Sequence, residues 1–388
     1  MNFSYYMPSR LFFGKGEIEK LATEKLPGKK ALLVISSGNS MKKYGYLDEV
    51  TDLLKKSGTE CVLFDKILPN PIKSHVMEGA ALAKAQGCDF VIGLGGGSSI
   101  DSAKAIAVMA ANEGDYWDYI RGGSGKGMPV PNKPLPIIAI TTTAGTGTEA
   151  DPWTVITKEE TGEKIGGGYD DTFPYFSIID PDLMMSVPPH LTAYQGFDAL
   201  FHSTEGYINK TANFMSDMYA LAAIELIGKY LPRAVNDGSD EEARAMVALA
   251  NTLAGMVEST SGCTSEHSLE HALSGYYPEL PHGAGLIMIS LEYNKLFAAK
   301  VCPERFVAMA KALGKADADK PEDFVTALAD LQKACGVENL KMSDYGIKAD
   351  EMQRVALHAK DIMGGLFEVD RYQLSVEEIV SILEKSYR

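Results

Sequence analysis

Cysteine, tryptophan and long apolar runs are all scarce in this sequence. It has five cysteines and two tryptophans in 388 residues, and no two cysteines form a C-x-x-C pair. Scattered cysteines of odd number indicate reduced thiols in a cytoplasmic protein rather than a disulfide framework. No run approaches the roughly 18 consecutive apolar residues of a membrane span, and residues 1–16 lack the basic and apolar regions of a secretory signal. We therefore expect neither a membrane span nor a secretory leader.

Positive charge is also in short supply. Lysine and arginine total 37 against 52 aspartates and glutamates, which gives a formal net charge of −15. An acidic surface repels phosphate backbones and anionic lipid headgroups, so we expect no nucleic-acid partner and no membrane partner. The length predicts two or three domains, and 45% hydrophobic residues are ordinary for a globular protein.

The first half of the chain alternates short apolar runs with amphipathic stretches. Continuous apolar runs bounded by glycine or proline predict strands that are buried on both faces. Helical periodicity fills the intervals between them, and this repetition predicts βαβ units and a doubly wound parallel sheet. The expected strands are 30–36, 61–64, 89–94 and 136–140, and the expected helices are 46–56, 73–86 and 98–111.

From about residue 186 the apolar residues recur three and four apart, which predicts helices throughout. Ser375 and Glu378 have the spacing of a capping box at the start of the last helix. The consecutive prolines at 188 and 189 mark a natural boundary. We therefore expect an α/β dinucleotide-binding domain over 1–186 and an α-helical metal-binding domain over 187–388. The expected helices of the second domain are 216–231, 241–258, 321–335, 350–363 and 376–385.

Two loops rich in small residues follow predicted strands. Gly95-Gly96-Gly97-Ser98 opens a helix, so its backbone N–H groups and the helix N-terminus suit a pyrophosphate. The loop is neither the G-x-G-x-x-G fingerprint nor a Walker sequence. The second loop, 141–148, carries five hydroxyls and two glycines. Either loop alone is open to interpretation as a plain turn, but two of them at the carboxyl ends of parallel strands favour a nucleotide cofactor.

Histidines are concentrated in one region. Five of the seven lie between 190 and 282, and Asp198/His202 and His267/His271 are each spaced four apart. On a helix this spacing places both side chains on one face. Imidazoles with a carboxylate are typical ligands of a catalytic Zn²⁺ or Fe²⁺ ion. Hydrogen-bonded core histidines are the alternative, and spacing alone does not choose four ligands among the candidates.

The long motifs of the chain resemble those of the iron-containing (group III) alcohol dehydrogenases. The resemblance rests on 95–98 with Asp101, on 142–146 with Glu149, and on segments 179–183, 196–207 and 267–283. It implies the dehydroquinate synthase-like fold of that family and the metal ligands Asp198, His202, His267 and His282. It also implies that His271 lies between metal and nicotinamide. The cofactor contacts that we expect are Ser37, Gly38, Ser40, Asn70, Gly96, Gly97, Ser98, Asp101, Thr142, Thr143, Thr146, Lys164 and Leu183.

One departure from the family pattern bears on the cofactor. Members that prefer NAD often carry an aspartate after the first strand, whereas segment 36–43 here has no acid and contains Lys42 and Lys43. This segment looks like the version in the butanol-dehydrogenase and aldehyde-reductase branch. The absence of a carboxylate removes repulsion against a 2′-phosphate, so we expect NADP(H) to be favoured over NAD(H). A polar turn with solvated lysines is the alternative.

The resemblance implies a metal-dependent, NAD(P)-linked alcohol dehydrogenase or aldehyde reductase that acts on a primary alcohol or aldehyde. We expect Fe²⁺, with Zn²⁺ as the alternative, in a cytoplasmic homodimer. His271 is the candidate for proton exchange, and Asp101 would help to place the nicotinamide. The alternatives are a glycerol-dehydrogenase-like polyol oxidoreductase, a dehydroquinate-synthase-like lyase and a non-enzymatic nucleotide-binding protein.

Overall fold

A computed structural model describes residues 2–388, and their contacts divide the chain into two compact units. The α/β unit comprises Met7–Thr143 and Thr148–Ser186. The helical unit comprises Ala144–Gly147, Val187–Arg388 and the described residues before Met7. These units differ from the expected ranges 1–186 and 187–388 at two short segments. The physical reasons are local: the Tyr5 ring packs on Tyr219, and the Gly147 N–H donates to Asn251 Oδ1.

A six-stranded sheet forms the centre of the α/β unit, with the strand order β1-β8-β5-β4-β2-β3. All its neighbouring strands are parallel. Every residue of β4 and β5 is buried, because helices cover both faces of the sheet. The doubly wound parallel sheet is therefore confirmed. The strands are β1 (Arg10–Phe13), β2 (Lys30–Ser36), β3 (Glu60–Ile67), β4 (Phe90–Gly95), β5 (Ile137–Thr141) and β8 (Phe176–Ile179).

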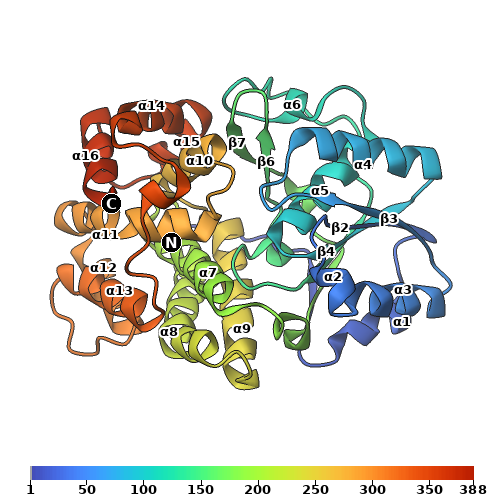
Figure 1. The fold of residues 1–388 in the computed structure, drawn as a ribbon, viewed down its shortest axis with the longest axis horizontal. Helices are drawn as coiled ribbons and strands as arrows, with labels where there is room; N and C mark the ends of the chain where they lie inside the picture. The colour runs from blue at the N-terminus through green and yellow to red at the C-terminus, as the bar shows by residue number, and fades with distance from the viewer. Residues whose placement is uncertain (1) are drawn as a thin grey trace. The chain divides into compact units, whose positions relative to one another are not determined.

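Figure 1 shows α1 and α3 on one side of these strands and α4 and α5 on the other. The first pair packs on an apolar core that includes Leu33, Ile92 and Ile140. Gly93 points to the opposite face, where a Cβ would meet Ile100 and Ala103 of α5. A two-stranded antiparallel sheet of β6 (Thr154–Lys158) and β7 (Glu163–Gly167) was not anticipated. The helices are α1 (Lys20–Thr23), α2 (Ser40–Lys43), α3 (Tyr46–Lys56), α4 (Lys73–Gln86), α5 (Gly97–Ala111) and α6 (Tyr116–Tyr119), with short 3₁₀ turns η1 (Glu17–Glu19), η2 (Thr148–Ala150), η3 (Asp170–Thr172) and η4 (Pro181–Met184).

The helical unit is built around α7, which contacts α8, α9 and α11 (Figure 1). Every residue from Gly196 to Ile208 in α7 is buried, as expected of a helix enclosed by others. Gly283 allows α11 to approach it closely, since a Cβ there would overlap the backbone carbonyl of Tyr194. The helices are α7 (Pro189–Ile208), α8 (Phe214–Asn236), α9 (Glu241–Thr260), α10 (Ser265–Tyr276), α11 (His282–Lys300), α12 (Pro303–Ala312), α13 (Glu322–Ala334), α14 (Met352–Ile362), α15 (Gly364–Glu368) and α16 (Val376–Ser386), with 3₁₀ turns η5 (Met342–Tyr345) and η6 (Ala349–Glu351).

Two helix N-termini have the local features that the sequence predicts. The expected capping box is present, because Ser375 Oγ accepts from the Glu378 N–H and the Glu378 carboxylate accepts from the Ser375 N–H. Pro189 occupies the first turn of α7, where its missing N–H costs no hydrogen bond. Among residues 2–388, no helix has both the length and the apolar character needed to cross a membrane.

Candidate active site

Four side chains from three helices converge in the helical unit. Asp198 and His202 lie one turn apart on α7, while His267 lies on α10 and His282 begins α11. Asp198 Oδ1 is 3.8 Å from the Nε2 of His202, 3.5 Å from that of His267 and 3.3 Å from that of His282. Asp198, His267 and His282, three of the four residues that the family resemblance implied as metal ligands, have ligand atoms within 4.8 Å of one another, and His202 faces the same Asp198 oxygen.

The other nitrogen of each imidazole faces a hydrogen-bond acceptor. His202 Nδ1 lies 3.3 Å from the Gly145 carbonyl oxygen. His267 Nδ1 is paired with Glu205, and His282 Nδ1 is paired with Glu270. An acceptor opposite Nδ1 places the hydrogen on that nitrogen and the lone pair on Nε2. The three Nε2 atoms are then left to face the Asp198 carboxylate oxygen.

This arrangement fits a divalent cation. Asp198 Oδ1 and His267 Nε2 are buried without a hydrogen-bond partner, which is costly for polar atoms unless a ligand satisfies them. Nitrogen and oxygen atoms bound at about 2.1 Å to a tetrahedral ion lie about 3.4 Å apart. The observed separations from Asp198 Oδ1 bracket that value. Metal-binding histidines normally make a hydrogen bond through the nitrogen that does not bind the metal, and the acceptors at Nδ1 match this pattern.

Electrostatics favour the protonation states that a metal requires for His202 and Asp198. At His267, by contrast, burial is outweighed by Cys263 and Glu205, which raise the pKa of the imidazole well above its usual value. Burial lowers the pKa of His202 to about 4, although Asp198 opposes the shift, so the imidazole is neutral at pH 7. Burial by itself would raise the pKa of the Asp198 carboxyl, but His202 and His282 lower it well below its usual range. A neutral imidazole and a carboxylate are both able to coordinate a cation.

His271 lies beside this group, one turn further along α10. Its ring centroid is 5.3 Å from that of His282 and 6.1 Å from that of His267. Its Nδ1 lies 3.0 Å from Met363 Sδ. One ring nitrogen of His271 also lies within 4.8 Å of ligand atoms of His282 and Glu270, and its predicted role in proton exchange stays a prediction.

Sequence reasoning missed the residues that support the histidines. Glu205 and Glu270 received no role, yet both are completely buried and each faces an imidazole Nδ1. A signal was present, because each glutamate follows a histidine by three positions, at 202–205 and at 267–270. The support is crossed between elements: Glu205 on α7 pairs with His267 on α10, and Glu270 on α10 pairs with His282 on α11.

A buried network of carboxyl groups continues behind His267. Glu205 Oε2 accepts from the backbone N–H and the hydroxyl of Thr264 at 2.7 and 2.9 Å. Asp370 Oδ1 accepts from the Ser265 N–H, and the Tyr293 hydroxyl lies 3.4 Å from it. Burial raises the pKa of Asp370 to about 7, and the nearby Glu205 adds to the shift. Burial and Glu205 likewise raise the pKa of Glu266 well above its usual value.

The α/β unit brings together most of the predicted cofactor residues. The Thr142 N–H donates to the Gly95 carbonyl, and a Cβ on Gly96 would crowd Thr143 Oγ1, so the two glycine-containing loops lie side by side. Ser98 Oγ donates to the carbonyl of Pro69, which precedes the expected contact Asn70. Ser37, Gly38 and Ser40 follow β2, which neighbours β4. These groups occupy the carboxyl ends of adjacent parallel strands, where doubly wound sheets bind nucleotides.

Other predicted contacts lie in different surroundings. Leu183 belongs to the apolar core beneath the sheet. Thr146 is part of the segment that groups with the helical unit, and Lys164 is buried on β7. Asp101 Oδ1 accepts from Thr148 Oγ1 at 2.7 Å and Oδ2 accepts from the Val155 N–H at 2.8 Å. In the structure, therefore, the Asp101 carboxylate ties α5 to η2 and β6.

Comparisons with known proteins give the family. Residues 8–181 match the model of the iron-containing alcohol dehydrogenases, and residues 192–387 match the C-terminal model of the same family. The chain is 38% identical over 365 residues to a choline dehydrogenase of Bacillus subtilis, covering 92% of this chain and 88% of the relative. It is 34% identical to a 1,3-propanediol dehydrogenase of Klebsiella pneumoniae, covering 99% of both chains.

Solved structures agree with these matches. An archaeal halo-thermophilic alcohol dehydrogenase from a Red Sea brine pool is 37% identical and has a TM-score of 0.94, with 100% of this chain and 99% of that chain covered. The buried donor cluster, the paired loops and these likenesses lead to one conclusion. The chain belongs to the iron-containing alcohol dehydrogenase family, and it is an oxidoreductase that transfers a hydride between an alcohol or aldehyde and a nicotinamide cofactor.

Proposed function

We propose that Asp198, His202, His267 and His282 hold one divalent ion and that the chain interconverts a primary alcohol and its aldehyde. The observation that carries this proposal is that the Nε2 atoms of the three histidines all lie within 4 Å of Asp198 Oδ1, while each Nδ1 faces an acceptor from another element. Fe²⁺ is the proposed ion and Zn²⁺ is the alternative. When bound, the ion supplies Lewis-acid chemistry for the negative charge that develops on the substrate oxygen.

The chain's own residues have the remaining tasks. Glu205, Glu270 and the Gly145 carbonyl fix the orientation of the three imidazoles before any ligand arrives. His271 exchanges the proton of the substrate hydroxyl with solvent, because an imidazole titrates near neutral pH. The N–H groups of Gly96, Gly97 and Ser98 bind the cofactor pyrophosphate at the start of α5.

Residues of loop 141–148 contact both the glycine loop and one of the proposed metal ligands. Thr142 and Thr143 contact the glycine loop, and Gly145, two residues further along, receives His202. Asp101 supports the cofactor end of this region through the hydrogen bonds that it makes to Thr148 and Val155. The remaining cofactor contacts proposed are Ser37, Gly38, Ser40, Asn70, Thr146, Lys164 and Leu183.

The proposed substrate is a small primary alcohol or aldehyde of the butanol-dehydrogenase type. Similar proteins carry the names 1,3-propanediol dehydrogenase, NADH-dependent butanol dehydrogenase and NAD-dependent methanol dehydrogenase. All three names denote primary alcohols. A polyol oxidoreductase is the alternative, and faster turnover of glycerol than of butanol or propanediol would favour it.

We propose a preference for NADP(H) over NAD(H) from the end of β2, where no acidic side chain follows the strand. One feature of the structure weighs against it: Lys42 Nζ pairs with Asp65 on the neighbouring β3 at 2.6 Å, which neutralises part of the charge that would attract a 2′-phosphate. Two relatives are also named for NAD or NADH. The ratio of kcat/KM for the two cofactors decides the matter, and a ratio in favour of NADH rejects the preference.

Three further proposals rest on the family resemblance and on sequence patterns. The chain forms a homodimer, which sedimentation analysis would test. It works in the cytoplasm, which cell fractionation would test. Residues 1–186 and 187–388 act as separate domains, and expression of each range with a ligand-binding assay would test that division.

One experiment tests the central proposal. Metal-stripped protein is reconstituted with ferrous iron or zinc, and the nicotinamide absorbance is followed with NADPH and NADH against short and medium aldehydes. We expect turnover to depend on the added ion. Full activity after exhaustive chelation would reject the metal role, and cofactor binding without turnover under any of these conditions would favour a non-enzymatic protein.

A further inference from the structure

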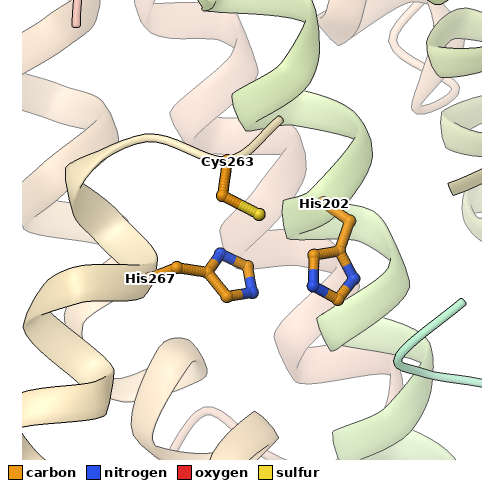
Figure 2. A group of neighbouring side chains, drawn as sticks. All are labelled: His202, Cys263 and His267. Atoms are coloured by element: carbon orange, nitrogen blue, oxygen red, sulfur yellow. The ribbon is translucent and has the colours of Figure 1, made fainter. Parts of the chain in front are cut away.

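A buried thiol lies against the histidine cluster and has no part in the proposed mechanism. Cys263 is in the connection between α9 and α10, just before α10 begins. Its sulfur and one nitrogen each of His202 and His267 all lie within 4.8 Å of one another, and all three residues are buried. In Figure 2 the sulfur points toward the space between the two imidazole rings.

A carboxylate from α9 lies beside one member of this group, His202. Glu258 on α9 places its Oε2 3.6 Å from His202 Nε2, and its side chain is 15% exposed. Neither Cys263 nor Glu258 is among the four residues proposed to hold the catalytic ion. His202 and His267 therefore have two kinds of further donor nearby, the Asp198 and His282 side chains and the Cys263 thiol, with Glu258 beside His202 alone.

The two sets differ in their chemistry. One carboxylate and three imidazoles form the harder set, which suits ferrous iron, whereas a thiolate with two imidazoles forms a softer set. Cys/His sites with four donors are typical of zinc, and thiolates are the preferred ligands of soft cations. His267 Nε2, which is buried without a hydrogen-bond partner, is a nitrogen already prepared for a cation.

We infer that His202, Cys263 and His267 form a second metal site that takes thiophilic cations such as Cd²⁺ and Zn²⁺. On binding, the Cys263 thiol loses its proton to solvent and one sulfur–metal bond forms, with no change of oxidation state. Because the two sets share two histidines, only one ion binds at a time. A thiophilic cation therefore blocks ferrous iron. This consequence for activity rests on the proposed function, whereas the binding itself does not.

Cadmium alone is the probe, because a thiolate–cadmium bond gives an ultraviolet charge-transfer band. Cys61 and Cys88 lie close enough to interact electrostatically, and cadmium bound by these two thiols would give the same band. Their contribution therefore has to be removed. The parent protein is therefore the full chain with Cys61→Ser, stripped of metal. We expect one cadmium per chain with the band in this parent, and loss of the band in the double variant Cys61→Ser/Cys263→Ser. An undiminished band in the double variant overturns the inference.

Two further measurements test the inference independently of the Cys263→Ser substitution. Cadmium-edge X-ray absorption of the parent needs no change at 263, and a first shell without sulfur overturns the inference even if the double variant misfolds. Asp198→Ala in the parent should keep the cadmium band and lose iron-supported turnover. If that variant keeps turnover, the proposed catalytic centre is wrong while the thiolate site stands. Simultaneous binding of Fe²⁺ and Cd²⁺ would overturn the shared-ligand inference.

Discussion

Glu205→Gln isolates the support that a residue outside the proposed ligand set gives to the metal centre. The Glu205 carboxylate is fully buried, pairs with His267 Nδ1, and accepts from the N–H and hydroxyl of Thr264. A glutamine keeps the shape, but its NH₂ group cannot accept a hydrogen bond and its charge is lost. Either His267 or Thr264 then faces the amide NH₂ group, which is a donor, in place of an acceptor. Because the hydrogen bond at His267 Nδ1 is weakened or lost, His267 Nε2 becomes less basic and the ring is held less firmly in its orientation.

Losses of this kind cost about 10- to 100-fold in metal affinity, which corresponds to about 1.4 to 2.7 kcal/mol. We expect the dissociation constant of Fe²⁺ for Glu205→Gln to rise by that factor, because the hydrogen bond is buried and charge-assisted. Turnover should recover in large part at saturating iron, since the four proposed ligands remain. Titration of metal-stripped protein against a chelator of known affinity measures the first quantity, and steady-state kinetics measures the second.

Glu266→Gln is the matched control. Glu266 precedes His267 in the chain and is also fully buried, but within residues 2–388 its carboxyl group receives only a 3.5 Å contact from Asn294 Nδ2. Burial and Glu205 raise its pKa, which favours the neutral acid that an amide resembles. We expect its iron affinity to change by well under about tenfold. Equal affinities for Glu205→Gln and the native protein, or equal losses in both variants, would refute the reasoning.

Three further predictions follow from the same geometry. His267→Ala should lose bound metal and turnover together in elemental analysis and kinetics, and a variant that keeps its metal would contradict the proposed ligand set. Gly283→Ala should lower the thermal unfolding midpoint, because its Cβ meets rigid backbone of α7 and overpacking costs about 1–3 kcal/mol; an unchanged midpoint would show that α11 shifts freely. Asp370→Asn should stabilise the protein increasingly as pH rises from about 4 to 7. In that window the native Asp370, whose pKa burial raises to about 7, binds a proton that the unfolded chain has lost, so folding of the native protein weakens with rising pH by at most roughly 4 kcal/mol. A stability difference between variant and native protein that is flat with pH would contradict this.

The sequence by itself determined the elements whose signals are local. Strands β2, β4 and β5 are long apolar runs, and α3 and α4 occupy the predicted residues because amphipathic periodicity is a property of neighbouring positions. The placement of Asp198 and His202 on one helical face is local in the same sense, since four residues make about one turn. Short β1 and β8 were not predicted, because four-residue strands carry too little pattern and form through their pairing with each other and with β5.

Only the tertiary structure decided which of the five candidate histidines face one another. His190 lies exposed against Tyr194 at the start of α7, whereas His282 enters the cluster because Gly283 lets α11 approach α7. The partners of each Nδ1 come from other elements, as Glu205 does for His267. The same packing placed Cys263 beside two of the imidazoles. The contacts of His267 with Glu205 and of His202 with Gly145 join residues more than fifty positions apart, which leave no periodic trace in a single sequence, so packing alone fixes how these two rings are turned.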